Sequence, residues 1–418
     1  MAWIISYKRP VSLIVLADIM AFALLYFYKK PFDWYILLAG FIVISLICTT
    51  YFIIVKKSLG DEYLFLIVSM LASIGFIMIY RLERELGFKQ IVWFAGGLVL
   101  FFISYYIFLK IRFWDKLIVY YIAAAILLFT ATLVFGENIK GSTNWIVIAG
   151  YSFQPAELIK IIFIFTLACF YKRAEQYISL SKKLLLPENN LMRKLAVSLI
   201  SYSFIVFLIL QRDWGSALLF FMIHFTMLYI FEKSYSFLLV NAITAFIGGI
   251  GGFLFLYHIK VRFDTWINPW SDIAGKGYQI TQSLFAIATG GFFGTGIGMG
   301  RPDLIPEVNT DFIFSAICEE MGIFGGVAVI LLYFILTYRG FKIALSVDDM
   351  FRKVVALGIT AVFGFQTFII VGGVIKLIPL TGITLPFISY GGSSLTTSFI
   401  ALGILQAISS TENIKREV

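Results

Sequence analysis

Long apolar runs separated by short polar segments dominate this 418-residue chain. The runs are continuous and not alternating, and many approach the roughly 20 residues that an α-helix needs to cross a bilayer. Alternation would instead be typical of a membrane β-barrel. We therefore predict twelve membrane-spanning helices, over residues 12–28, 34–55, 63–80, 90–109, 117–135, 155–171, 194–210, 214–232, 237–257, 311–338, 354–375 and 389–410.

The composition agrees with an all-α polytopic membrane protein. Hydrophobic residues make up 60% of the chain, charged residues make up 14%, and the mean hydropathy is +0.93. These values exclude a water-soluble domain of this length. The first apolar run lacks a small-residue cleavage site and a second run follows it at once, so we interpret it as a span and not as a removed signal peptide.

The distribution of positive charge predicts the orientation. The larger share of the 33 lysines and arginines lies in the loops on the side of the two termini, and the positive-inside rule places that side in the cytoplasm. Residues 258–310 then form a large extracellular loop, with Asp311 at the outer end of the next helix. The net charge of +9 indicates anchoring at the membrane surface and no nucleic-acid partner.

Cysteine and histidine form no metal or disulfide pattern. Cys48, Cys169 and Cys318 lie in apolar runs without a CxxC spacing, so we interpret them as small buried hydrophobic residues. His224 and His258 are too far apart along the chain to have the spacing of a metal-ligand pair.

Ionisable residues in or beside apolar runs are candidate functional groups because a charge at membrane depth is costly. Asp18, in the middle of the first run, either pairs with another helix or faces water. Glu157 and Lys160 are i, i+3 neighbours that form either a structural ion pair or the polar floor of a head-group cleft. Asp213 either caps the following helix and pairs with Arg212, or faces the outer cleft.

Residues 275–326 differ from the rest of the chain. A glycine-rich stretch over 290–300 is followed by an acidic turn, Glu307 to Asp311, which runs into a hydrophobic helix. The glycines lack a βαβ context, so they indicate a re-entrant or flexible backbone beside a cavity and not a dinucleotide site. Glu319 lies about 12 Å deeper than Asp311 at 1.5 Å per residue, which favours a structural or cavity-lining role. Glu307 is either a second acid or a loop charge.

A second polar segment, IPLTGITLPFISYGGSSL, covers residues 378–395. Its prolines and glycine pair break the helical pattern. Ser393 and Ser394 are polar at a depth where polar groups need partners, and interrupted helices with polar backbone are where membrane proteins build binding sites.

Several blocks resemble the SEDS family, the RodA, FtsW and SpoVE proteins of bacterial shape, division and sporulation. The resemblance covers about residues 60–412 and is carried by six blocks: FQPAELIK (153–160), NPW (268–270), GYQITQS (277–283), PEVNTDFIFS (306–315), EEMG (319–322) and LPFISYGGSSL (385–395). It implies a core of ten spans. We therefore expect two additional N-terminal helices over 1–58, the core over 59–412 and a cytoplasmic tail over 413–418.

The resemblance also implies an activity. Family members are multi-pass proteins of the bacterial cytoplasmic membrane that polymerise lipid II into glycan strands at its outer face, surrounded by membrane lipids and working with a class B penicillin-binding protein. The acidic residue of the family's TDF block is Asp311, which the resemblance makes catalytic. Gln279 and Gln282 of GYQITQS are candidate substrate contacts. The chain departs from the family at Asn144, where arginine is common, and around Asp213.

Glycan polymerisation joins a sugar hydroxyl to an anomeric carbon whose leaving group is a lipid diphosphate. We expect a single inverting displacement with Asp311 as the general base, because a covalent route needs a second carboxylate as nucleophile. Lys260, Arg262 and Lys276 are candidates for binding the diphosphate. A divalent cation, Mg²⁺ or Mn²⁺, is neither required nor excluded by the sequence.

Two other function classes fit many spans and buried acids: a lipid II flippase or other transporter, and a non-catalytic scaffold for wall-synthesis enzymes. Inverted repeats would favour a transporter, and the sequence shows none. The shared blocks do not separate elongation, division and sporulation.

Overall fold

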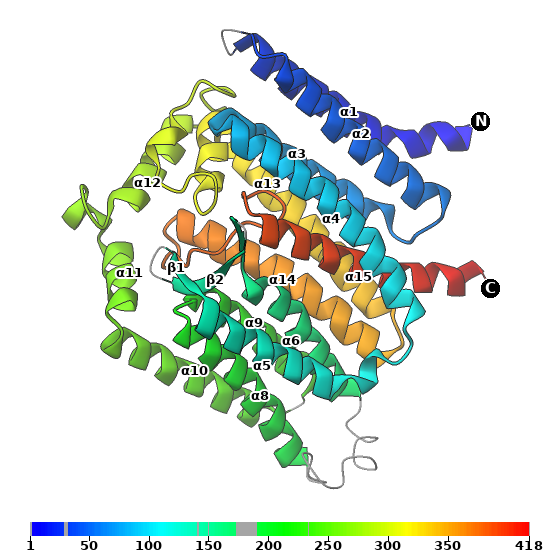
Figure 1. The fold of residues 1–418 in the computed structure, drawn as a ribbon, viewed down its shortest axis with the longest axis vertical. Helices are drawn as coiled ribbons and strands as arrows, with labels where there is room; N and C mark the ends of the chain where they lie inside the picture. The colour runs from blue at the N-terminus through cyan, green and yellow to red at the C-terminus, as the bar shows by residue number, and fades with distance from the viewer. Residues whose placement is uncertain are drawn as a thin grey trace. The chain divides into compact units, whose positions relative to one another are not determined.

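The computed structural model describes residues 2–28, 32–139, 142–148, 150–172, 190–232 and 234–417, and most of them are helical (Figure 1). The helices are α1 (Ala2–Tyr28), α2 (Tyr35–Lys56), α3 (Glu62–Leu82), α4 (Arg84–Lys110), η1 (Trp114–Lys116), α5 (Ile118–Phe135), α6 (Pro155–Lys172), α8 (Asn190–Leu210), α9 (Trp214–Phe231), α10 (Tyr235–Phe255), α11 (Tyr257–Ile267), η2 (Pro269–Asp272), α12 (Tyr278–Gly290), η3 (Pro302–Leu304), α13 (Ile313–Ser346), α14 (Met350–Val374) and α15 (Gly392–Glu417). The strands are β1 (Glu137–Ile139), β2 (Ser142–Ile148) and β3 (Tyr151–Phe153).

Each predicted span coincides with a helix, and ten helices among the described residues are long and apolar enough to cross a membrane. The other two predicted spans are α6, whose 18 residues include Glu157, Lys160 and Lys172, and the apolar part of α8, Lys194–Leu210. The helical membrane class is confirmed, and the count of twelve stays a prediction. The predicted loop 258–310 holds two α-helices, α11 and α12, and two short 3-10 helices, η2 and η3. Its sidedness stays a prediction.

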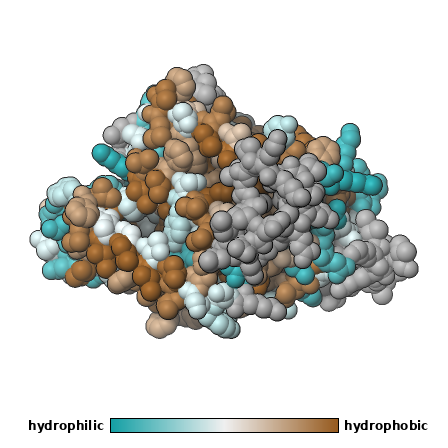
Figure 2. All heavy atoms as spheres, turned by 90° about the horizontal axis from the view of Figure 1, so that it is seen from below, coloured by the Kyte–Doolittle hydropathy of each residue, from teal (hydrophilic) through white to brown (hydrophobic). Residues whose placement is uncertain are grey.

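The surface has the character expected of a protein that faces lipid. Figure 2 shows broad hydrophobic patches on the face seen from below. Large apolar side chains such as Phe255, Tyr235 and Leu345 are more than four-fifths exposed. Monomeric soluble proteins rarely expose contiguous apolar patches of great extent, whereas in a bilayer such side chains contact acyl chains.

The chain divides into two compact units. Unit 1 consists of Met1–Tyr105, Arg262–Arg339 and Ile370–Val418, and unit 2 consists of Tyr106–Val261 and Gly340–Ile369. Unit 1 contains the N-terminal helices together with both signature blocks around Asp311 and residues 385–395. Unit 2 contains the FQPAELIK block.

In unit 1, the N-terminal hairpin of α1 and α2 packs on α3 (Figure 1). The two hairpin helices approach closely, because a side chain on Gly40 would contact the ring of Phe22. Asp18 of α1 is buried, and its Oδ2 accepts a hydrogen bond of 3.0 Å from Ser73 Oγ of α3. Asp18 therefore pairs with another helix, one of its two predicted alternatives.

The remaining helices of unit 1 also approach closely. Two glycines allow this approach because they carry no side chain. Gly75 of α3 lies against the backbone of Ile388, and Gly97 of α4 lies against the ring of Phe399 in α15. At one end, Arg339 makes a bidentate ion pair with Asp61, with contacts of 2.7 and 2.6 Å. These contacts join α4 to α15 and the start of α3 to α13.

In unit 2, α5, α6, α8 and α9 form a bundle with an aromatic core. Phe163 stacks on Phe220 with ring centroids 4.7 Å apart, and Phe129 stacks on Phe207 at 5.0 Å. Strands β1, β2 and β3 form a small antiparallel sheet, in which Val147 pairs with Ser152. The sequence pattern predicts no strands there, because segments of three to seven residues show too little alternation to be distinguished from a turn.

We predict that Ser73→Ala weakens the packing of the N-terminal hairpin. The substitution leaves a buried carboxyl of Asp18 without its partner, which is expected to destabilise the fold by about 1–3 kcal/mol. The measurement is unfolding of the full chain in mixed micelles. Ser69→Ala on the same helix is the control, since the buried Ser69 hydroxyl donates only to the Leu66 carbonyl within α3. Equal stability of the two variants would contradict the prediction.

Candidate active site

Asp311 lies in a tight turn that precedes α13, and is half-buried. The amides of Thr310, Asp311 and Phe312 all donate to the carbonyl of Glu307, at 3.1, 3.1 and 3.3 Å. The helix begins at Ile313, two residues later than predicted, because these amides are already bonded within the turn. Asp311 is therefore presented from a turn and not from the first helical position.

The segment 385–391 braces this turn. Ser389 Oγ donates to the carbonyl of Thr310 at 2.6 Å, and the Tyr390 amide donates to the carbonyl of Asn309 at 2.8 Å. Gln90 of α4 in turn donates to the Ser389 carbonyl at 3.1 Å. The two family-like blocks, far apart in sequence, thus form one hydrogen-bonded substructure in unit 1.

Arg262 and Asp311 converge on Gly382. A Cβ placed on Gly382 would lie 3.4 Å from Asp311 Oδ2 and 3.7 Å from Arg262 Nη2. The Arg262 guanidinium also donates to the carbonyl of Thr381 at 2.7 Å and to that of Leu380 at 3.3 Å. Glycine at 382 has a φ of +75° and leaves the carboxylate and the guanidinium space beside the backbone.

Backbone strain gathers around this site. Glu307, Lys376 and Phe387 have φ values of 59°, 63° and 65°, which are rare for residues with a side chain and cluster at functional sites. Tyr390 lies beside the strained segment.

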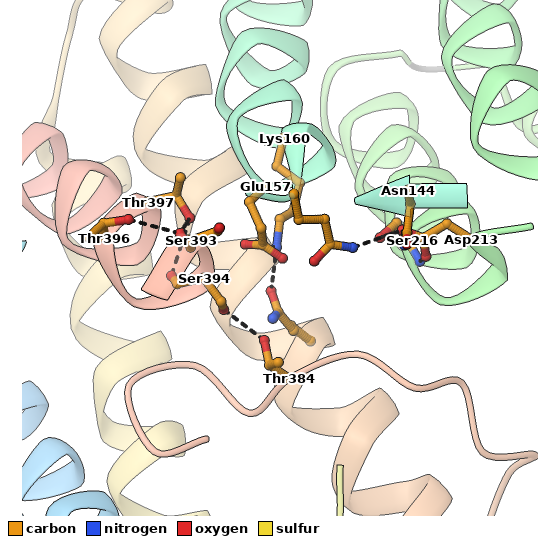
Figure 3. Close-up of polar contacts among 12 residues, drawn as sticks. Asn144, Glu157, Lys160, Asp213, Ser216, Thr384, Ser393, Ser394, Thr396 and Thr397 are labelled. Atoms are coloured by element: carbon orange, nitrogen blue, oxygen red, sulfur yellow. Dashed lines mark hydrogen bonds and ion pairs between the residues drawn. The ribbon is translucent and has the colours of Figure 1, made fainter. Parts of the chain in front are cut away.

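The other predicted residues of unit 1 lie on α12, just before α12 and at the start of α15. Ser393 and Ser394 are buried at the start of α15, where the Ser394 and Thr384 hydroxyls are 2.7 Å apart (Figure 3). Gln279 and Gln282 lie half-buried on α12, and Lys276 is exposed just before it.

The glycine-rich segment 290–300 packs on α13 at a helix break. Gly322 has a φ of +71°, which a side chain would strain, and it interrupts the helical hydrogen-bond ladder. Glu319 lies next to this break. It is buried, and its Oε1 accepts from the Arg301 amide at 2.7 Å, which supports the structural role that its depth predicted.

In unit 2, Glu157 and Lys160 form the predicted ion pair. Lys160 Nζ lies 2.7 Å from Glu157 Oε2, with both side chains buried, and also donates to Gln366 Oε1 at 3.1 Å (Figure 3). The pair therefore has a third, neutral partner from α14, which the sequence analysis did not identify.

Asp213 is the predicted cap of α9, and it is buried. Its Oδ1 accepts from the Ser216 amide at 3.0 Å. Its Oδ2 accepts from Ser216 Oγ at 2.9 Å, Asn144 Nδ2 at 3.0 Å and Gln154 Nε2 at 3.2 Å (Figure 3). The predicted pair with Arg212 is wrong: within the described part of the chain, the partners of Asp213 are these neutral donors. Lys260 is exposed on α11.

The described residues contain no group of three or more His, Cys, Asp or Glu side chains placed to hold a metal ion. We assign no metal ligands, and the chemistry below involves only residues of the chain.

Comparison with known proteins identifies the family. The family model described as "Cell cycle protein", which comprises FtsW, RodA and SpoVE, matches residues 61–414. The chain belongs to the FtsW/RodA/SpoVE family. The matched residues begin after the α1–α2 hairpin.

Individual members of the FtsW/RodA/SpoVE family support this assignment. Peptidoglycan glycosyltransferase RodA of Mycobacterium tuberculosis is 37% identical over 369 residues, which cover 84% of this chain and 78% of that protein. Stage V sporulation protein E of Bacillus subtilis is 34% identical over 377 residues, which cover 85% of this chain and 98% of that protein. A solved structure described as a peptidoglycan synthase complex that coordinates polymerisation and crosslinking aligns with a TM-score of 0.67 and 25% identity, over 84% of this chain and 98% of that one.

For this FtsW/RodA/SpoVE family member, sequence reasoning missed several supports of the site. Gln90 and Tyr333 lie in apolar runs, and Tyr333 donates its hydroxyl hydrogen to the Pro386 carbonyl. Ser283 of α12 meets Ser315 of α13 at 2.7 Å. The position of Gln90 in an apolar run indicates that its side chain needs a polar partner. The sequence does not show that this partner is the Ser389 carbonyl.

We predict that Lys160→Met destabilises the protein by about 3–5 kcal/mol, because it leaves the buried Glu157 carboxylate unpaired. The double variant Glu157→Gln/Lys160→Met should regain most of that stability. Unfolding in mixed micelles measures both variants. A double variant that is less stable than the single one would contradict the ion-pair interpretation.

Proposed function

We propose that this protein is a peptidoglycan glycosyltransferase that polymerises lipid II into glycan strands. The names of its relatives support the reaction class. The observation that carries the proposal is the convergence of Asp311 and Arg262 at Gly382, on a turn braced by residues 385–391. A carboxylate and a guanidinium beside one open glycine supply the base and the cation that the reaction needs.

In the proposed mechanism, Asp311 takes the proton from the sugar hydroxyl of the acceptor. The hydroxyl oxygen forms the new bond to the anomeric carbon of the donor, and the bond from that carbon to the lipid diphosphate breaks. The diphosphate leaves with the electron pair, and Arg262 stabilises its charge. A single displacement of this kind inverts the anomeric configuration, and the proton passes from Asp311 to water.

Neighbouring groups have supporting roles in this proposal. Glu307 shapes the turn through its carbonyl, so its carboxylate is not needed as a second acid. Gln279 and Gln282 are proposed sugar contacts on α12. Lys276 is a further candidate cation for the diphosphate. Ser393 and Ser394 hold the start of α15 against the segment that braces Asp311.

Residues of unit 2 have separate proposed roles. Buried pairing favours a structural role for Glu157 and Lys160, and capping favours the same for Asp213. Lys260, exposed on α11, stays a proposed contact for lipid head groups or diphosphate.

We also propose the topology and partner of the enzyme. The charge distribution supports cytoplasmic termini in a bacterial cytoplasmic membrane, which places Asp311 at the outer face, where exported lipid-linked sugars are found. The similarity to a chain of a peptidoglycan synthase complex supports a class B penicillin-binding protein as partner. Relatives named for shape, division and sporulation support wall synthesis as the process without selecting one branch.

We predict that Asp311→Asn abolishes polymer formation, lowering the rate by at least about 10²-fold, the lower range for loss of a general base. Purified full-length protein in liposomes, with lipid II and its partner, is assayed for glycan chains on gels. Translocation of lipid II without polymer would instead support a flippase. Normal polymer from Asp311→Asn would refute the catalytic assignment.

We predict that Arg262→Met lowers kcat/KM by about 10²-fold, the magnitude typical of removing one charge-stabilising donor. Arg262→Lys should retain part of the activity because it keeps a cation. Lys342→Met is the comparison, since it removes an exposed cation of α13 that has no assigned role in the site. If Lys342→Met is as damaging as Arg262→Met, the placement of Arg262 beside Gly382 does not explain its role.

A further inference from the structure

The chain segment that carries Asp311 is a loop closed at its base. Residues 302–317 connect the glycine-rich segment 290–300 to residues 319–324 of α13, and these two ends of the loop are hydrogen-bonded to each other. Four backbone hydrogen bonds close the base: Thr295 N to Glu319 O at 2.9 Å, Gly296 N to Glu320 O at 3.0 Å, Ile323 N to Gly291 O at 2.9 Å and Phe324 N to Phe292 O at 3.3 Å.

The helix break at Gly322 explains this pattern. In an unbroken helix, the carbonyls of residues 319 and 320 accept from the amides of residues 323 and 324. The positive φ of Gly322 separates these groups, and each of them instead pairs with the glycine-rich segment. Side chains at Gly290, Gly294 or Gly322 would collide with the facing backbone, so glycine is needed for this approach.

Two acidic side chains add to the closure of the base. Glu320 Oε2 accepts from the Gly298 amide at 2.9 Å, and Glu319 Oε1 accepts from the Arg301 amide at 2.7 Å. Both side chains are buried. Two neighbouring buried carboxylates repel one another and lose their hydration, so this arrangement needs a cation.

Arg81 of α3 supplies that cation. Its Nε lies 2.6 Å from Glu320 Oε1, and its Nη2 donates to the Gly300 carbonyl at 2.5 Å. Arg81 therefore contacts both sides of the base, the helix through Glu320 and the glycine-rich segment through Gly300. Three residues later, Arg84 points to a different partner, Asp33 of the N-terminal hairpin, at 3.2 Å.

We propose that Arg81 is a positioning residue for the polymerisation reaction: paired with Glu320, it holds the base of the loop closed and thereby fixes the turn that carries Asp311. Its effect on catalysis rests on the proposed function of Asp311. Its effect on the loop does not, because the base contacts exist whatever the loop does chemically.

The test compares Arg81→Met, Arg81→Lys and the double variant Arg81→Met/Glu320→Gln in the full-length protein, reconstituted in liposomes. Arg84→Met is the control, since it removes an arginine from the same turn without touching the base. Two readouts are taken: hydrogen exchange of the amides of residues 294–301, and kcat and KM for lipid II polymerisation with the partner present.

We expect Arg81→Met to speed amide exchange over residues 294–301 by at least tenfold, to lower kcat by about 30-fold and to change KM by less than threefold. Arg81→Lys should lie in between, because it keeps the charge but loses the second contact. The double variant should recover part of kcat, because the carboxylate that pairs with Arg81 is then neutral and no longer repels that of Glu319. The same recovery keeps the test valid if Arg81→Met alone fails to fold.

Two results would overturn the proposal. One is that Arg81→Met has amide exchange rates and a kcat within threefold of those of Arg84→Met. The other is that Arg81→Met has faster amide exchange over residues 294–301 but an unchanged kcat. The contacts at the base of the loop would then be structural and would not position Asp311. Failure of the proposed function looks different, because polymer would then be missing from the wild type or present in Asp311→Asn, while the exchange result would still report on the base.

Discussion

Buried backbone amides and carbonyls must find partners within the protein, and the region around Asp311 is organised by this constraint. A break in α13 at Gly322 releases two carbonyls and two amides, and the glycine-rich segment 290–300 satisfies all four. Small residues are required because backbone meets backbone. The chain between these contacts is then free to form a non-helical turn, which is what presents a carboxylate at the end of a hydrophobic helix.

The same unit shows how loops can be held as firmly as helices. The turn at residues 307–311 is bonded to residues 389 and 390, and that segment is bonded to Gln90 and Tyr333. Strained residues such as Glu307 and Phe387 persist because the surrounding contacts over-determine them. A rigid presentation of Asp311 agrees with a reaction in which a base must meet one hydroxyl in one geometry.

Buried charges in this protein are compensated in different ways. Glu157 and Lys160 neutralise one another in α6, while Asp213 is held by neutral donors and a helix N-terminus. Asn144, at a position where the family commonly has arginine, is one of those donors. Three amide groups and one hydroxyl donate to Asp213, and these four donors satisfy the buried carboxylate without a cation.

The sequence by itself determined the helical membrane class, because hydropathy is a local property. Its family motif singled out Asp311 as the proposed leading acid, and i, i+3 spacing allowed the Glu157–Lys160 pair as one of two alternatives. It could not distinguish Arg262 from Lys260 and Lys276, since all three are cations in one loop, and only the fold places Arg262 beside Gly382. It offered a cap paired with Arg212 as one of two alternatives for Asp213, and the fold supplies Asn144, Gln154 and Ser216 as the partners. Arg81 and Glu320 are more than 200 residues apart, so only tertiary structure could reveal their contact: which buried groups meet depends on helix packing, and no local pattern records it.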